Sequence, residues 1–176
     1  MLDLKQDFFA LFGLPTGFSV DMDRLEQAYL DIQGKVHPDR FAHLPDVDKR
    51  LSMQWATHAN EAFRTLKSPL ARGQYLLELK GIDPAFETNT AMSPAFLMEQ
   101  MEWREALGEA REAADEEVLE DLARRIRHSN RSLIEQLAVQ LDQQGDLEGA
   151  ADTVRRLKFL EKLQHEINDA LTALES

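Results

Sequence analysis

The stretch DMDRLEQAYLDIQGKVHPDRFAHLPDVDKRLSMQWATHANEAFRTLK, residues 21–67, predicts two amphipathic helices joined by a stiff loop. Apolar residues recur every three or four positions over residues 25–36, and Asp21 is a suitable N-cap for that helix. A second apolar stripe with the same spacing covers residues 51–66. Because alternating strand patterns are absent from the sequence, the stretch predicts an antiparallel pair of helices.

The loop between these helices contains the tripeptide His37-Pro38-Asp39. The first helix should end at Val36, because a proline disfavours helical geometry in the residues just before it. The next helix is expected to begin within residues 46–48, which leaves a loop of about ten residues, longer than most helix–helix connections. Such a loop presents an imidazole and a carboxylate on a rigid support. On the tripeptide alone, a polar turn that merely caps the helices is the simpler interpretation.

The remainder of the chain differs in composition from this first part. Residues 1–80 carry 10 basic and 11 acidic side chains, whereas residues 81–176 carry 10 basic and 21 acidic ones. All six prolines lie at or before Pro94, so the stretch after it can hold long helices. The change in composition predicts a linker over residues 81–92 between an N-terminal domain and a C-terminal domain.

The C-terminal domain, residues 93–176, is expected to be a three-helix bundle. Its first helix should begin at Ser93-Pro94, where serine caps and proline occupies the first turn. Apolar stripes over residues 119–141 and 160–174 predict two further helices, separated by a break at Gly145. We therefore expect an all-α protein.

Composition excludes several classes of function. The net charge of −12 disfavours nucleic acid as the main partner, and the lack of cysteine excludes disulfides and thiolate metal sites. The sequence has no apolar run of about 18 residues and no signal-peptide pattern, so a cytoplasmic protein is expected. Phosphate-binding loops, nucleophile motifs and the Glu-x-x-His pairs of di-iron bundles are absent. We expect no cofactor, no metal and no catalytic residue.

The helix that follows Ser93 has two dissimilar faces when it is projected at about 100° per residue. One face carries the expected core residues Phe96, Trp103, Leu107 and Ala110. The opposite face carries Leu97, Met98 and Met101, beside Glu102 and Glu105. This pattern indicates an exposed, protein-binding apolar patch with a carboxylate rim, and Phe159 on the last helix could reach it. The alternative is that the bundle buries both faces and Phe159 with them.

The N-terminal domain resembles the J-domain family, co-chaperones of DnaK-class ATP-driven chaperones. The resemblance follows the chain in order, through residues 8–14, 25–36, 60–69 and 72–75, with His-Pro-Asp in the loop. It implies that this loop docks on the chaperone's ATPase domain and promotes ATP hydrolysis. The implied chaperone-binding residues are His37, Pro38 and Asp39, flanked by Lys35 and Arg40.

One departure from the family concerns the helix before the loop, which usually carries several basic residues. Here it carries only Arg24 and Lys35, with Glu26 and Asp31 among them. This departure suggests a specialised chaperone partner or help from the second domain.

The segments FLMEQMEWREAL (96–107) and DTVRRLKFLEKL (152–163) extend the resemblance to nearly the whole chain. They are similar to the HscB family, the Hsc-type J-domain co-chaperones of bacterial iron–sulfur cluster assembly. This resemblance implies a C-terminal domain that binds the cluster scaffold protein, of IscU type, for a chaperone of HscA type. The implied scaffold-binding residues are Leu97, Met98, Met101, Glu102, Glu105 and Phe159. Two alternatives stay open: a general J-domain co-chaperone for unfolded clients, and a helical-bundle metalloprotein.

Overall fold

The computed structural model describes residues 3–84 and 93–176, and the described residues form helices and loops without a strand. They fall into two compact units, Met1–Leu76 and Leu77–Ser176. The all-α prediction is therefore confirmed. Within the described ranges, no helix is both long and apolar enough to cross a lipid bilayer.

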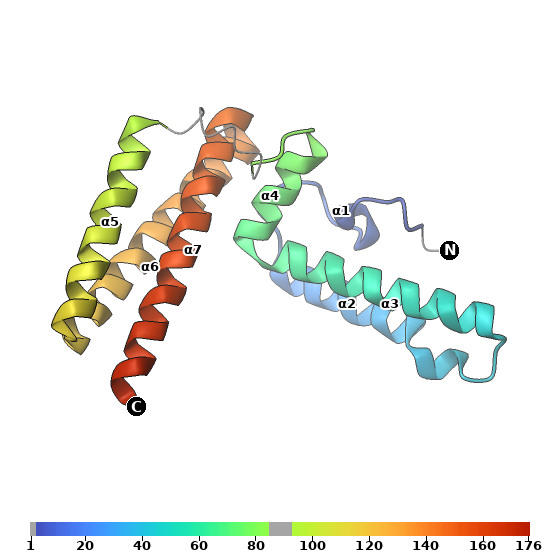
Figure 1. Ribbon diagram of the computed structural model, residues 1–176. Coiled ribbons are helices and arrows are strands. Elements are labelled where there is room, and N and C mark those ends of the chain that lie inside the picture. The colour runs from blue at the N-terminus through green and yellow to red at the C-terminus, as the bar shows by residue number, and fades with distance from the viewer. Residues whose placement is uncertain (1–2, 85–92) are drawn as a thin grey trace. The chain divides into compact units, whose positions relative to one another are not determined.

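The first unit is built around a helical hairpin, shown in blue to green in Figure 1. Its elements are α1 (Phe8–Leu11), α2 (Met22–Val36), the 3₁₀ turn η1 (Pro38–Phe41), α3 (Asp46–Lys67) and most of α4 (Pro69–Leu79), which runs into the second unit at Leu77. The helices α2 and α3 pack against each other along the hairpin. The ends predicted for α2 and the start predicted for α3 are confirmed.

The apolar stripe of α3 is only partly buried. Ala59, Ala62 and Leu66 lie in the core, but Leu51 is exposed and Trp55 is half-buried. The reason is the length of the partner helix: α2 ends at Val36, so the first turns of α3 lie beside the loop and η1.

The short helix α1 packs on α3 and is also bonded to α4, which follows it far along the chain. The Phe8 ring stacks on the Tyr75 ring at 4.4 Å between centroids, and the Phe8 N–H donates to the Tyr75 hydroxyl at 2.9 Å. The buried guanidinium of Arg72 donates to the carbonyl oxygens of Phe18 and Leu66, each at 2.6 Å. These bonds join α4 to the open end of the hairpin, where α2 begins and α3 ends. They also supply the donors that the two buried carbonyls require.

The second unit contains three long helices that lie side by side (Figure 1). They are α5 (Pro94–Ala113), α6 (Glu116–Ala138) and α7 (Leu147–Glu175), with the π-helical turn η3 (Val139–Gln144) after α6. The core contains the predicted residues of all three helices, among them Trp103, Leu107, Leu122, Ile126, Leu163 and Ile167. The three-helix bundle is confirmed.

Of the expected linker, residues 81–92, the structure describes 81–84, and residues 85–92 lie outside the described ranges. Gly81 takes a positive φ of 79° after α4, a conformation that favours glycine. The Pro84 carbonyl accepts a hydrogen bond from the Arg155 guanidinium of α7 at 3.2 Å. The start of the linker is thus attached to the second unit.

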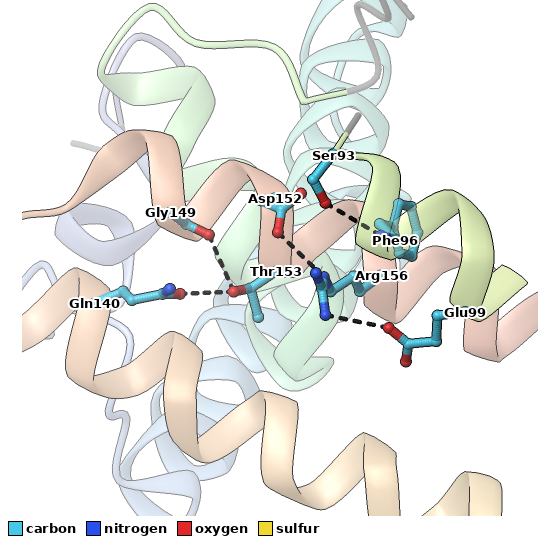
Figure 2. Close-up of polar contacts among 8 residues, drawn as sticks. All are labelled: Ser93, Phe96, Glu99, Gln140, Gly149, Asp152, Thr153 and Arg156. Atoms are coloured by element: carbon cyan, nitrogen blue, oxygen red, sulfur yellow. Dashed lines mark hydrogen bonds and ion pairs between the residues drawn. The ribbon is translucent and has the colours of Figure 1, made fainter. Parts of the chain in front are cut away.

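The connection between α6 and α7 contains a π-helical turn and a helix cap in addition to the glycine that the sequence predicts. Gly145 takes a positive φ of 62° and Asp146 caps α7, its carboxylate accepting from the Gly149 N–H at 3.0 Å. Figure 2 shows the buried Thr153 hydroxyl between the Gln140 side chain, at 2.8 Å, and the Gly149 carbonyl, at 3.0 Å. The π-helical turn brings Gln140 inward, so that the polar group is buried with a partner.

Replacing Gly149 by alanine is expected to lower the free energy of unfolding by about 1–2 kcal/mol, the usual cost of a lost N-cap. A Cβ at this position would clash with Asp146 Oδ2 and lie 3.0 Å from Gln140 Nε2, so the capping carboxylate must move. Urea unfolding followed by circular dichroism measures the change. The matched control is Gly108→Ala on α5, where a Cβ meets nothing within 4 Å and helix propensity predicts a small gain. Equal effects at the two glycines would contradict the steric argument.

Candidate functional site

The loop after α2 presents the side chains of His37 and Asp39 to solvent. His37 leaves the helix in an extended conformation, and Pro38 opens the 3₁₀ turn η1. The side chain of His37 is 52% exposed and that of Asp39 is 92% exposed. The Asp39 N–H donates to His37 Nδ1 at 3.2 Å, which orients the imidazole. In this arrangement the proton of the neutral ring is on Nε2, where it can be donated to a partner.

The position of the loop is fixed by a bond from α3. The Ser52 hydroxyl, in a side chain that is buried, donates to the Val36 carbonyl at 2.6 Å. This carbonyl belongs to the last turn of α2, which leaves its carbonyls without a partner inside the helix. The residue that precedes His37 is therefore attached to the hairpin. Sequence reasoning missed Ser52, because no local pattern connects residues that are 16 positions apart.

The two basic residues predicted beside the loop are both exposed. Lys35 lies in the last turn of α2 and Arg40 lies in η1, where its N–H donates to the His37 carbonyl at 3.0 Å. The surface around the tripeptide thus carries a carboxylate, an imidazole donor and two cations. His43 lies nearby in the chain, but the described residues contain no group of three His, Cys, Asp or Glu side chains suited to hold a metal.

The first helix of the second unit has the two faces that its sequence predicts. Ser93 caps it, and its hydroxyl accepts from the Phe96 N–H at 3.2 Å (Figure 2). Phe96, Trp103, Leu107 and Ala110 are buried. On the other face Leu97 is 45% exposed, Met98 62% and Met101 71%, and Glu102 and Glu105 are exposed beside them. The alternative in which the bundle buries both faces is therefore wrong.

The exposed face of α5 continues into a hollow against α7. Its volume is about 740 Å³, and its lining includes Leu97, Met101, Glu105 and Phe159. These four predicted residues meet there, whereas Met98 and Glu102 lie outside the hollow on the same helix. The remaining lining residues, which sequence reasoning missed, are Gln100, Arg104 and Lys162.

Phe159, which is half-buried, is held in place from two sides. Its ring packs edge-to-face on Phe96 at 6.1 Å between centroids, and the Arg104 guanidinium lies 5.5 Å over it. Arg104 also forms an ion pair with Glu166 of α7. Arg104 could have been found from the sequence, because it follows Met101 by three residues and therefore lies on the same side of the helix.

A second arginine joins α5 to α7 near the start of the patch. Figure 2 shows Arg156 between Asp152, at 3.1 Å, and Glu99, at 3.2 Å. Its guanidinium also lies 5.2 Å over the Phe96 ring. Together with the Arg104–Glu166 pair, this contact joins α5 to α7. The surface is pre-organised, apolar at its centre and charged at its edge, which is the anatomy of a protein-binding site.

Comparisons with known proteins agree for both units. The model of the HSCB C-terminal oligomerisation domain matches residues 92–168. The co-chaperone protein HscB homolog of Aromatoleum aromaticum is 62% identical over 175 residues, which cover 99% of each chain. The chaperone HscB from Vibrio cholerae superposes with a TM-score of 0.83 at 38% identity, covering 96% of this chain and 99% of that one. Human co-chaperone protein HscB gives a TM-score of 0.87 at 30% identity, with coverage of 94% and 82%.

Proposed function

Because the chain belongs to the HscB family of co-chaperones, we propose that it presents an iron–sulfur cluster scaffold protein to a specialised DnaK-class chaperone. The scaffold is of IscU type and the chaperone of HscA type, and the loop of the first unit stimulates the chaperone's ATPase. The proposed domains are a J-domain over residues 1–80, a linker over 81–92 and a scaffold-binding domain over 93–176. The chain itself is an adaptor in the cytoplasm, and the chaperone hydrolyses the ATP.

The observation that carries this proposal is the presence of two exposed surfaces of different chemistry in two separate units. The loop around His37 and Asp39 is polar and charged, and the α5 patch around Leu97 and Met101 is apolar. Each of the two partners therefore has a surface of its own on the chain. If scaffold binding and chaperone binding are coupled, the loop stimulates the ATPase more strongly when the scaffold is present. Such coupling is a free energy that the two linked binding events share.

On the chaperone side, Asp39 and His37 have distinct roles. The Asp39 carboxylate is almost fully exposed, so it can form a charge pair with a basic group of the chaperone and become desolvated there. The Nε2–H of His37 supplies a directed donor beside it. Lys35 and Arg40 face an acidic surface and raise the association rate.

On the scaffold side, the apolar residues of the patch supply the contact area. Met98 and Met101 adapt to the shape of a partner because their side chains are unbranched and flexible. Phe159 and Leu97 offer firmer anchors at the hollow, since the Phe159 ring is already packed. Glu102 and Glu105 form an acidic rim that steers a basic partner surface.

The experiment that tests this function measures ATP hydrolysis by the HscA-type chaperone with the chain, with the scaffold, and with both. The expected rate with both exceeds the sum of the separate stimulations, because the adaptor brings loop and client to one chaperone. A strictly additive rate would contradict the proposal. Unfolded apolar peptides serve as the comparison client: if they replace the scaffold at equal effect, the protein is a general J-domain co-chaperone.

A further inference from the structure

The helix before the loop offers few basic side chains for docking on an acidic partner surface. The exposed side of α2 carries only Arg24 and Lys35 as basic residues. Charge contacts between exposed side chains contribute little each, so a helix with two of them binds an acidic surface weakly. The first unit therefore needs another source of affinity near the loop.

A pocket of about 420 Å³ lies directly beside the loop. Its apolar lining comes from the end of α2, from η1 and from the first turns of α3, namely Val36, Phe41, Leu51 and Trp55. Lys35 and Asp48 supply the charged part of the lining. The pocket exists because α2 ends before it can cover the start of α3.

The apolar surface continues out of the pocket along α3. Leu51 is exposed, and so is Val47, which lies one helical turn before it. Leu44, in the preceding loop, is exposed as well. Single exposed apolar residues need no explanation, but an apolar pocket with exposed neighbours marks a binding surface.

Hydrogen bonds join the pocket to the loop. Val36 lines the pocket, and its carbonyl accepts from Ser52, another lining residue, at 2.6 Å. The His37 carbonyl accepts from the Arg40 N–H, and the Phe41 carbonyl from the Leu44 N–H, each at 3.0 Å. A partner that engages the loop therefore meets the pocket in a fixed position.

The charged side chains around the pocket favour an occupant that projects from an acidic surface. Residues 35–50 contain four basic side chains, Lys35, Arg40, Lys49 and Arg50, and three acidic ones, Asp39, Asp46 and Asp48. This small positive excess stands out in a chain whose net charge is −12. An acidic partner surface is attracted here and repelled by most of the remaining chain.

We propose that this pocket binds an apolar side chain that projects from an acidic surface of the same DnaK-class chaperone. The inference rests on the proposed function, and it adds an apolar anchor to the polar contacts of the loop. A side chain that fills a preformed pocket is a common binding hot spot. It removes apolar surface from water, and little conformational entropy is lost because the pocket is already formed. The anchor supplies the affinity that the two basic residues of α2 do not.

The test uses the full-length chain, the HscA-type chaperone and its ATPase as readout. Leu51→Glu places a carboxylate in the pocket opposite an acidic surface, and the half-maximal concentration for stimulation is expected to rise by about tenfold or more. The maximal rate at saturation stays near that of the native chain, since His37 and Asp39 are unchanged. Leu51→Met, which keeps an apolar side chain of similar volume, is expected to restore the native half-maximal concentration.

The matched control is Met53→Glu, the same kind of change at an exposed position of the same helix that does not line this pocket. It is expected to leave the half-maximal concentration within about twofold of the native value. Thermal unfolding checks that each variant folds. If Leu51→Glu does not fold, Leu51→Ala takes its place, with an expected rise of about threefold or more.

Three results would overturn the inference, and each is distinct from failure of the proposed function. An unchanged half-maximal concentration for Leu51→Glu removes the pocket from the interface. If the maximal rate falls and the half-maximal concentration is unchanged, Leu51 supports the conformation of the loop and does not contact the chaperone. If Leu51→Glu changes the sedimentation coefficient of the chain in the absence of the chaperone, the pocket binds a second copy of the chain instead. If the native chain does not stimulate the chaperone at all, the proposed function itself fails.

Discussion

Replacing His37 by glutamine is expected to abolish stimulation of the chaperone's ATPase while binding of the scaffold protein stays unchanged. His37 Nδ1 accepts a hydrogen bond from the Asp39 N–H, which leaves the proton of the neutral ring on Nε2. A glutamine side chain has more rotatable bonds and does not hold both groups in this geometry. Loss of a hot-spot contact of at least about 2 kcal/mol corresponds to a fall of about 30-fold or more.

This prediction needs two measurements on the same preparation. ATP hydrolysis by the chaperone reports the loop, and calorimetry with the scaffold reports the second unit. His128→Gln provides the control, because His128 is an exposed histidine on α6. A variant at His37 that loses both activities would disprove the division of labour between the two units.

Replacing Leu97 and Met101 together by alanine is expected to raise the dissociation constant for the scaffold by on the order of 100-fold. Both side chains are exposed in the free chain and line the same hollow, so they are available to a partner as one apolar surface. Their exposure also means that truncation leaves no cavity, and the free energy of unfolding should change by less than about 0.5 kcal/mol. Calorimetry with the full-length chain measures the affinity.

The control for this pair is the double variant Val118→Ala with Leu174→Ala, which removes exposed apolar groups of the same unit away from the hollow. It should bind the scaffold with native affinity. Stimulation of the chaperone in the absence of scaffold should be native in both double variants. Scaffold binding that survives the Leu97 and Met101 changes would move the site to another surface.

The hairpin and the two faces of α5 could be predicted because their signals are local. A proline sets the end of α2 two residues before it, and helical spacing separates Phe96 and Trp103 from Leu97 and Met101. Each of these inferences needs only residues within a few turns of one another. The predicted site residues of α5 are accessible for the same reason.

What could not be predicted depends on contacts between distant segments. Ser52 reads as an ordinary helix residue until the hairpin brings it to the Val36 carbonyl. Gln140 has no partner in its own helix, and only the π-helical turn brings it to Thr153. Leu51 fits the stripe of α3, but the length of α2 decides that it stays exposed. Periodicity reports which side of a helix is apolar, and the partner helix determines how far that side is covered.

Synthesis of the chain from its N-terminus leaves α1 without one of its two partners, α4, while most of the first unit is being made. The Tyr75 hydroxyl and ring that hold Phe8 come 67 residues after it. At roughly 5–20 residues per second the ribosome needs several seconds for this stretch, whereas helices form within about a microsecond. The hairpin of α2 and α3 can therefore close, and α1 can pack on α3, before α4 emerges and adds the contacts of Tyr75 to Phe8. A nascent chain stalled before Tyr75 lacks these contacts, and its first helix should be cut by proteases more readily than that of the finished protein.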